Sequence, residues 1–192
     1  MVRFEAKYIF GTEKESRNST NLGLPYQSKH NYFQVEISYE RYFKAWNWLT
    51  LGVDANSYLS TKKLFNNFTS SLISAHDYSP TVNSSIRYLP YLRADNFVAG
   101  GLKIIVPISS SAHLRFEGYY FQPFSELMNG TNNVPYYNTR LFTSNQYIGS
   151  GGLVVHTPFG PASLLLNYFS NSDPRVYLQA SFGFLLFNRR GK

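Results

Sequence analysis

The sequence predicts an all-β protein, an antiparallel up-and-down transmembrane β-barrel of about eight strands. Hydrophobic and polar residues alternate with period two through most of the 192 residues, as in half-buried strands. Short turns and long polar loops follow one another in regular alternation, which is typical when every second connection lies on the same side of a membrane. Aromatic residues make up 18% of the chain and charged residues only 15%, against roughly 25% in ordinary soluble domains.

The first predicted strands lie in the N-terminal third, at residues 2–10, 31–43 and 48–59. The second sets an apolar row that includes Phe33 and Ile37 against a polar row that includes Gln34 and Glu36. A long polar loop precedes this strand, and a short turn connects it to the third. This pattern predicts a hairpin with one apolar and one polar face.

The remaining strands are predicted at residues 96–106, 112–121, 145–156, 162–169 and 175–187. Long connections at residues 60–93 and 122–143 contrast with short turns such as 157–161. The strand at 112–121 places Arg115 and Glu117 on the face opposite Leu114 and Phe116. We therefore expect Glu117 to face the polar interior of the barrel.

Strand length and aromatic placement support a membrane setting. Strands of about 9–13 residues match the span of a tilted transmembrane strand. Aromatic residues near strand ends suit the interfacial girdles of such barrels. They are Tyr42, Trp46, Trp48, Tyr58 and Tyr168. The alternative is that these aromatics pack the core of a soluble protein.

The composition also limits the kinds of site and partner. The chain has no Cys, which excludes disulfides, thiolate metal sites and cysteine nucleophiles. Its net charge of +7 is spread over scattered Lys and Arg, so we expect surface or headgroup charge and no nucleic-acid partner. The four histidines, His30, His76, His113 and His156, are far apart in the sequence. We expect no metal site and no cofactor.

The N-terminal residues alternate from the start and show no signal peptide. An outer-membrane protein needs such a peptide for export. We therefore expect residues 1–192 to form one domain or fragment, the C-terminal half of a larger barrel, whose start lies upstream.

Several short motifs resemble one family in their order and spacing. They are Ala6-Lys7-Tyr8-Ile9-Phe10-Gly11, Tyr39-Glu40-Arg41-Tyr42-Phe43, Leu89-Pro90-Tyr91-Leu92-Arg93-Ala94, Gly100-Gly101-Leu102-Lys103, His156-Thr157-Pro158-Phe159-Gly160-Pro161, Asn167-Tyr168 and the ending Phe182 to Arg190. Nearly the whole chain resembles the C-terminal barrel region of Bacteroidetes-type patatin-like phospholipases. That region belongs to the BamA/TamA-like outer-membrane superfamily, also called bacterial surface antigen domains.

The resemblance implies a family barrel of about 16 strands, of which this chain is the C-terminal half. It also implies that residues 60–93 form a loop inserted into the lumen, with Arg93 at the loop tip. Ala94 and Asp95 depart from the glycine and the aromatic residue that the family tip motif carries. In related barrels the loop arginine contacts an acidic lumen residue, and Glu117 is the local candidate. Two unrelated solvated charges remain the alternative.

Patatin-like lipases use a serine in Gly-x-Ser-x-Gly, and this chain lacks that motif. Ser150 lies among glycines within a predicted strand, where bending or close backbone approach in the barrel wall explains the glycines. We expect no enzyme activity from the chain. The leading hypothesis is an outer-membrane barrel segment that anchors or helps to translocate an attached domain.

The expected partners are outer-membrane lipid and the missing N-terminal part of the barrel or parent chain, with a homo-oligomer also open. Two other functions remain open. The chain is either a self-contained eight-stranded outer-membrane barrel with a structural or adhesin role, or a soluble lipid-binding barrel.

Overall fold

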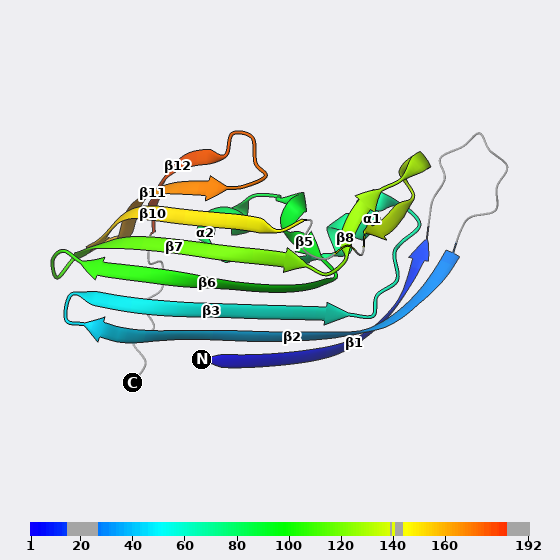
Figure 1. Cartoon of the computed structure of the whole chain (residues 1–192), viewed down its shortest axis with the longest axis horizontal. Coiled ribbons are helices and arrows are strands. Elements are labelled where there is room, and N and C mark those ends of the chain that lie inside the picture. The colour runs from blue at the N-terminus through cyan, green and yellow to red at the C-terminus, as the bar shows by residue number, and fades with distance from the viewer. Residues whose placement is uncertain (15–26, 139, 141–143, 184–192) are drawn as a thin grey trace.

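A large antiparallel sheet of eight strands forms the framework of the protein (Figure 1). The computed structural model describes residues 1–14, 27–138, 140 and 144–183. Strands hold 65% of the residues and helices 11%, which confirms the predicted all-β class. The strands of the main sheet are β1 (Val2–Lys14), β2 (Gln27–Trp46), β3 (Leu49–Ser60), β6 (Asn96–Pro107), β7 (Ala112–Pro123), β10 (Gln146–Thr157), β11 (Gly160–Phe169) and β12 (Val176–Phe182).

Each main strand pairs with the main strand next to it in sequence, in the order β1-β2-β3-β6-β7-β10-β11-β12. This is the predicted up-and-down arrangement, and all eight predicted strands are present. Residues 184–187 of the last predicted strand lie outside the described residues. In the described part of the chain β1 and β12 are the edge strands, and no pairing joins them, so the sheet is open.

The connections differ in length between the two ends of the sheet. Tight turns join β2 to β3, β6 to β7 and β10 to β11 at one end, on the left in Figure 1. The connections from β3 to β6 and from β7 to β10 lie at the other end and carry structure of their own. The three tight turns therefore lie at one end, and the two long described connections lie at the other end together with the short connection of residues 170–175 between β11 and β12.

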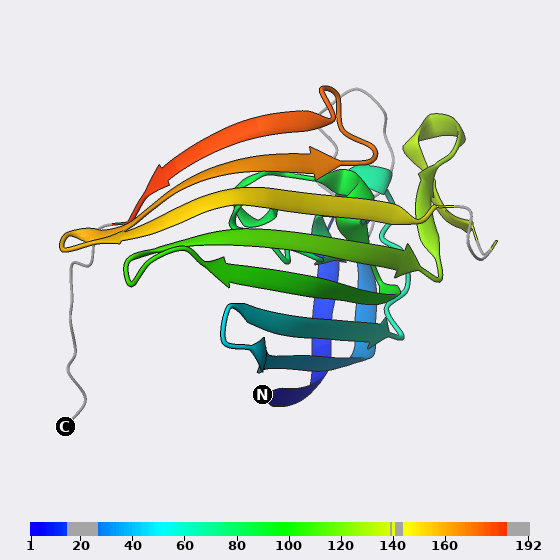
Figure 2. The same cartoon turned by 60° about the vertical axis from the view of Figure 1, so that its left-hand side comes forward.

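The connection from β3 to β6, residues 61–95, is called here the inserted segment. It contains α1 (Phe68–Ser74), β4 (His76–Asp77), α2 (Val82–Ile86), the 3-10 helix η1 (Pro90–Leu92) and β5 (Arg93–Ala94). The Asn67 and Thr81 side chains accept from the backbone N–H groups of Ser70 and Ser84 and so cap the two helices. The sheet curves around this segment, which lies against its concave face (Figure 2).

The connection from β7 to β10 contains a small hairpin, where the sequence predicted an irregular loop. Strands β8 (Glu126–Asn129) and β9 (Pro135–Asn138) pair across the 3-10 helix η2 (Thr131–Asn133). Asn132 and Asn133 have positive φ angles of 58° and 61° in this turn. Asparagine tolerates this conformation better than most residues, which explains why the chain reverses here.

Among the described residues, no helix has both the length and the apolar character that crossing a membrane requires.

Candidate functional site

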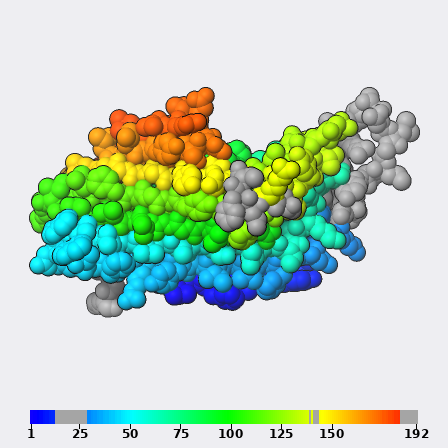
Figure 3. All heavy atoms as spheres, in the orientation of Figure 1, coloured from blue at the N-terminus to red at the C-terminus, as the bar shows by residue number. Residues whose placement is uncertain are grey.

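The two faces of the main sheet differ sharply in polarity. Side chains alternate between the faces along every strand, and the register keeps each row on one side. The convex face is apolar and exposed on all eight strands. Its exposed apolar residues include Phe4, Tyr8, Phe33, Ile37, Leu59, Val98, Leu102, Ile104, Phe116, Tyr147, Leu153, Leu164, Leu166, Val176, Leu178 and Phe182. The space-filling view shows the strands as one continuous surface (Figure 3).

The concave face carries the polar rows, as predicted for Gln34, Glu36 and Glu117, and Lys103 lies on the same face. Part of this face is covered by the inserted segment, and a hydrophobic core lies between the two. The segment contributes Tyr78, Leu89, Leu92 and Ala94 to this core. They pack against residues of the main sheet that include the fully buried Phe97. The core is therefore built by the inserted segment and not by a second sheet.

Aromatic contacts join the inserted segment to strands from β3 to β12 of the main sheet. The His76 ring stacks on Tyr58 of β3 with centroids 4.0 Å apart. At the opposite edge, the Arg87 guanidinium lies 3.9 Å from the Tyr177 ring centroid and donates to the Tyr177 hydroxyl at 2.9 Å. Contacts from β3 to β12 fix the position of the segment on the concave face.

A buried ion pair closes the base of the inserted segment. Lys62 at its start lies 2.6 Å from the carboxylate of Asp95 at its end, and both side chains are almost fully buried. The Tyr137 hydroxyl of β9 donates to the same carboxylate at 2.7 Å. Burial, together with the charge of Asp95, raises the pKa of Tyr137, so it stays protonated as a donor. This cluster joins the segment to the β8–β9 hairpin.

The structure does not join the two lumen-loop candidates, Arg93 and Glu117. The Arg93 guanidinium donates to the backbone oxygens of Ile73 and Ala75, at 2.9 and 3.3 Å. Asp77 is its nearest acidic partner, with Nε and Oδ1 3.9 Å apart. Arg93 therefore holds the inserted segment together from within and does not contact the wall carboxylate that the resemblance suggested.

Glu117 faces the concave side and is buried, as the alternation predicted, but its partner is Arg115 on the same strand. The Arg115 Nη2 lies 2.5 Å from Glu117 Oε1, and Nε donates to that oxygen at 2.6 Å. Residues two apart share a face of a strand, so the sequence itself carried this signal. The acidic side chain thus has a local partner on its own strand.

Beside Glu117 lies a second ion pair on the concave face. Lys103 of β6 is 2.5 Å from Glu40 of β2 and donates to the Tyr42 hydroxyl at 3.2 Å. Tyr42 reaches Lys103 by lying over Gly52, where a Cβ atom would stand 2.8 Å from its ring. Tyr42 and the buried Tyr58 thus lie on the concave side, in register with Lys103 and Phe97, and not on the convex face that an interfacial girdle requires.

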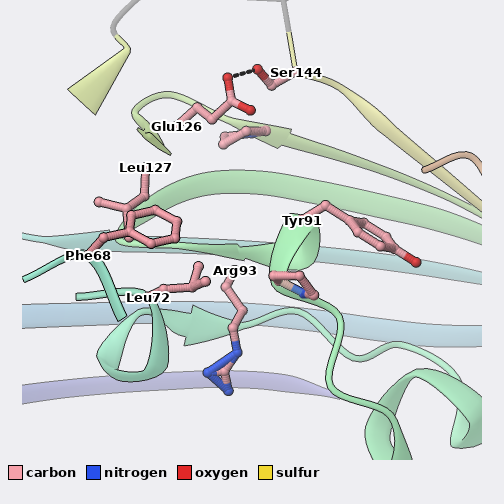
Figure 4. Close-up of a pocket in the computed structure, with 9 residues that line it drawn as sticks. Phe68, Leu72, Tyr91, Arg93, Glu126, Leu127 and Ser144 are labelled. Atoms are coloured by element: carbon pink, nitrogen blue, oxygen red, sulfur yellow. Dashed lines mark hydrogen bonds between the residues drawn. The ribbon is translucent and has the colours of Figure 1, made fainter. Parts of the chain in front are cut away.

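A pocket of about 220 Å³ lies between the inserted segment and the β8–β9 hairpin. Phe68, Leu72 and Leu127 give it an apolar lining, and Ser144 donates to Glu126 at its rim (Figure 4). The Arg93 guanidinium points away from Glu126 (Figure 4). The only cation among the described lining residues is thus turned away from the acidic side chain.

A polar cavity of about 340 Å³ lies between the inserted segment and strands β2 and β3. Its lining residues are Glu36, Asp54, Asn56, His76, Asp77, Tyr78, Ser79 and Pro80. Burial lowers the pKa of His76 and outweighs the opposite effect of Glu36. The imidazole is therefore neutral at neutral pH, and the carboxylates set the charge of this cavity.

The structure places two of the four histidines together, which their separation in the sequence did not suggest. The rings of His113 on β7 and His156 on β10 have centroids 5.3 Å apart. Two nitrogen ligands are fewer than the three or four that zinc sites use. Within the described residues, no group of at least three His, Asp or Glu side chains could hold a metal ion.

Ser150 lies within β10 and faces the concave side, opposite Glu117 in the register. This confirms its predicted place in a strand, away from any strand-to-helix elbow. Neighbouring Gly151 lies under the ring of Phe116, where a Cβ atom would stand only 2.9 Å away. Close approach of an aromatic ring thus explains one glycine of this run.

No family model, no curated protein and no solved structure matches the chain.

Proposed function

We propose that the chain is a non-catalytic segment of an outer-membrane β-barrel, which anchors or helps to translocate an attached domain. The observation that carries the proposal is the exposed apolar convex face, which extends over all eight strands of the sheet. Soluble monomers rarely expose a contiguous apolar patch above a few hundred Å². In a bilayer this same face is the favourable one, because hydrocarbon then replaces water.

The concave face supports the same proposal from the other side. Ion pairs such as Glu40–Lys103 and Arg115–Glu117 lie there, on the face that would line the lumen. The inserted segment packs against it with its own aromatic core. A soluble lipid-binding barrel would carry the reverse arrangement, with its apolar face turned inward around a ligand.

The open edges favour part of a larger barrel over a self-contained one. Unpaired backbone N–H and C=O groups are costly in hydrocarbon, so a transmembrane sheet has to close. Within the described residues β1 and β12 do not pair with each other. Strands from the rest of a parent chain would pair with these edges and complete the barrel.

Two neighbouring leucines on β11 give a matched test of the membrane-facing surface. Leu166 lies on the convex face and is 54% exposed, whereas Leu165 lies on the concave face. A lysine facing hydrocarbon near the bilayer centre costs about 2–4 kcal/mol. In lipid vesicles we expect Leu166→Lys to lower the free energy of unfolding by about this amount and Leu165→Lys to lower it much less.

The measurement is urea unfolding of the full chain and of both variants, folded into vesicles and followed by tryptophan fluorescence. Equal effects of the two substitutions would remove the case for a lipid-facing convex side. A chain that folds to a monomer in buffer without detergent, with Leu166→Lys silent, would also contradict the proposal.

The attached domain rests on the resemblance to patatin-like phospholipases alone. Its test is the reading frame upstream of the codon for Met1 in the genome. A signal peptide and a Gly-x-Ser-x-Gly motif in frame would support a parent phospholipase. An upstream stop codon with neither feature would contradict it.

A further inference from the structure

The polar cavity between the inserted segment and the wall is acidic in a chain whose net charge is +7. Glu36, Asp54 and Asp77 all line it. Two of these carboxylates have partners. Glu36 accepts from the Asn56 amide at 3.3 Å, and Asp77 lies 3.9 Å from Arg93.

Asp54 differs from the other two carboxylates. Among the described residues no hydrogen bond or ion pair reaches it, although it is half-buried on the concave face. Lys103, the nearest lysine along the wall, is held by Glu40 at 2.5 Å. The neutral His76 imidazole supplies no compensating charge. The Asp54 carboxylate therefore faces the cavity without a hydrogen-bond or ion-pair partner among the described residues, although the charge of Lys103 acts on it from a distance.

Two further polar atoms of the lining have no partner. The Tyr78 side chain is 5% exposed, and its hydroxyl makes no hydrogen bond. Tyr78 and Asp54 both line the cavity, and burial, together with the charge of Asp54, raises the pKa of Tyr78, so its hydroxyl stays protonated. The Asn56 Oδ1 atom is also buried without a partner. Buried polar atoms without a partner are rare in native proteins, and each such atom needs an explanation.

These groups together present acceptors. A primary ammonium group has three N–H donors and no acceptor. The Asp54 carboxylate, the Asn56 carbonyl oxygen and the Tyr78 hydroxyl oxygen give it three acceptors, and the carboxylate balances its charge. Glu36 or Asp77 offers a second acidic group in the same cavity. A volume of about 340 Å³ lies within the range of small-molecule sites.

We propose that this cavity binds a small alkyl diamine, with one ammonium group held by Asp54, Asn56 and Tyr78. A divalent metal ion fits less well, because the described carboxylates do not converge on one point. The positive net charge of the chain repels amines in general. Binding therefore has to come from these local acceptors.

The test is isothermal titration of the full chain in a non-ionic detergent with putrescine, with 1-butanol and magnesium chloride as comparison ligands. We expect saturable binding of putrescine alone. Loss of a hydrogen bond to a charged group weakens binding by about tenfold or more, so Asp54→Asn is expected to do so. Tyr78→Phe is expected to weaken binding by a smaller factor.

Asp173→Asn is the matched control, because Asp173 is exposed in the β11–β12 turn, far from the cavity in the sheet. It is expected to bind putrescine as the unchanged chain does. Circular dichroism checks that each variant is folded, and Tyr78→Phe tests the site without altering the wall charge. No saturable putrescine binding, equal binding by Asp54→Asn and Asp173→Asn, or magnesium binding of equal strength would each overturn the proposal.

Discussion

At the scale of single residues, the ion pairs that contribute most to stability are those whose buried side chains have no other partner. Lys62 and Asp95 are removed from water together, and a buried charge without its partner is far more costly than a buried pair. Glu117 shows the opposite case, because Arg115 on the same strand already satisfies it. Glu117 thus contacts its local partner Arg115 and not Arg93, the partner that the resemblance suggested.

Removing one member of the Lys62–Asp95 pair is expected to destabilise the protein strongly. Asp95→Asn should lower the free energy of unfolding by about 3–5 kcal/mol, since Lys62 then stays buried without a counter-charge. Replacing both residues, as Lys62→Met with Asp95→Leu, should recover much of the loss. Urea unfolding midpoints in detergent measure both effects. A single variant as stable as the unchanged chain would show that the pair is solvated.

Two glycines on neighbouring strands predict opposite responses to alanine. A Cβ atom at Gly101 would lie 2.1 Å from the Tyr119 ring, whereas a Cβ at Gly118 would meet nothing within 4 Å. We expect Gly101→Ala to cost about 1–3 kcal/mol through overpacking. Gly118→Ala should be neutral or stabilise the protein by about 0.4–1 kcal/mol. Thermal unfolding of both variants checks this, and equal midpoints would contradict the close packing of Tyr119.

At the scale of elements, the sequence predicted the main strands well and the connections poorly. The period-two pattern is local, so all eight strands and the concave side of Glu117 followed from it. The short elements of the inserted segment lack such a pattern, because contacts with the wall stabilise them. Asn67 and Thr81 were usable signals for the two helices, since both residue types favour N-caps.

The candidate site was predicted only in part, for the same reason. The sequence indicated a long connection at residues 60–93, which only the resemblance placed inside a barrel, and the structure places this connection on the concave face of the sheet. The cavity lining combines β2 and β3 with residues after α1, which depends on how the segment folds back. Spacing along the chain could not show that Asp54 and Tyr78 lie on one cavity.

His76 on β4 of the inserted segment is expected to make the stability of the protein depend on pH. Burial lowers the pKa of His76 from its ordinary value of 6.5, so the unfolded chain binds the proton more readily than the folded one. The neutral His76 imidazole therefore makes its full contribution to stability above pH 6.5. This contribution is lost as the pH falls from 6.5 through the lowered pKa of His76. We expect the unfolding midpoint to decrease over this window in the unchanged chain.

His76→Phe keeps a ring against Tyr58 and removes the titrating group. As the pH falls below 6.5, the unchanged chain should therefore lose stability relative to this variant. Denaturant unfolding at several pH values measures it. A difference that stays constant with pH would mean that His76 is free to ionise in the folded state.

At the scale of the whole molecule, the decisive features are one apolar convex face and two open edges. An edge strand offers a row of unpaired backbone groups to any other strand. The described parts of β1 and β12 are such edges, and nothing in the sheet covers them. Alone in detergent, the chain is therefore expected to pair through these edges with other copies, whereas a parent barrel would pair them with its own strands.

The lack of Cys makes this edge pairing directly testable. Ala6 on β1 and Ala180 on β12 are exposed on the two edges. With both changed to cysteine, a short bismaleimide is expected to link separate chains, giving dimers and larger species on a denaturing gel. Ala6→Cys with Val35→Cys is the control, because these residues face each other across β1 and β2 and should be linked within one chain. A link within one chain in the Ala6–Ala180 variant would show that the eight strands close on themselves, and the self-contained barrel would then replace the larger one.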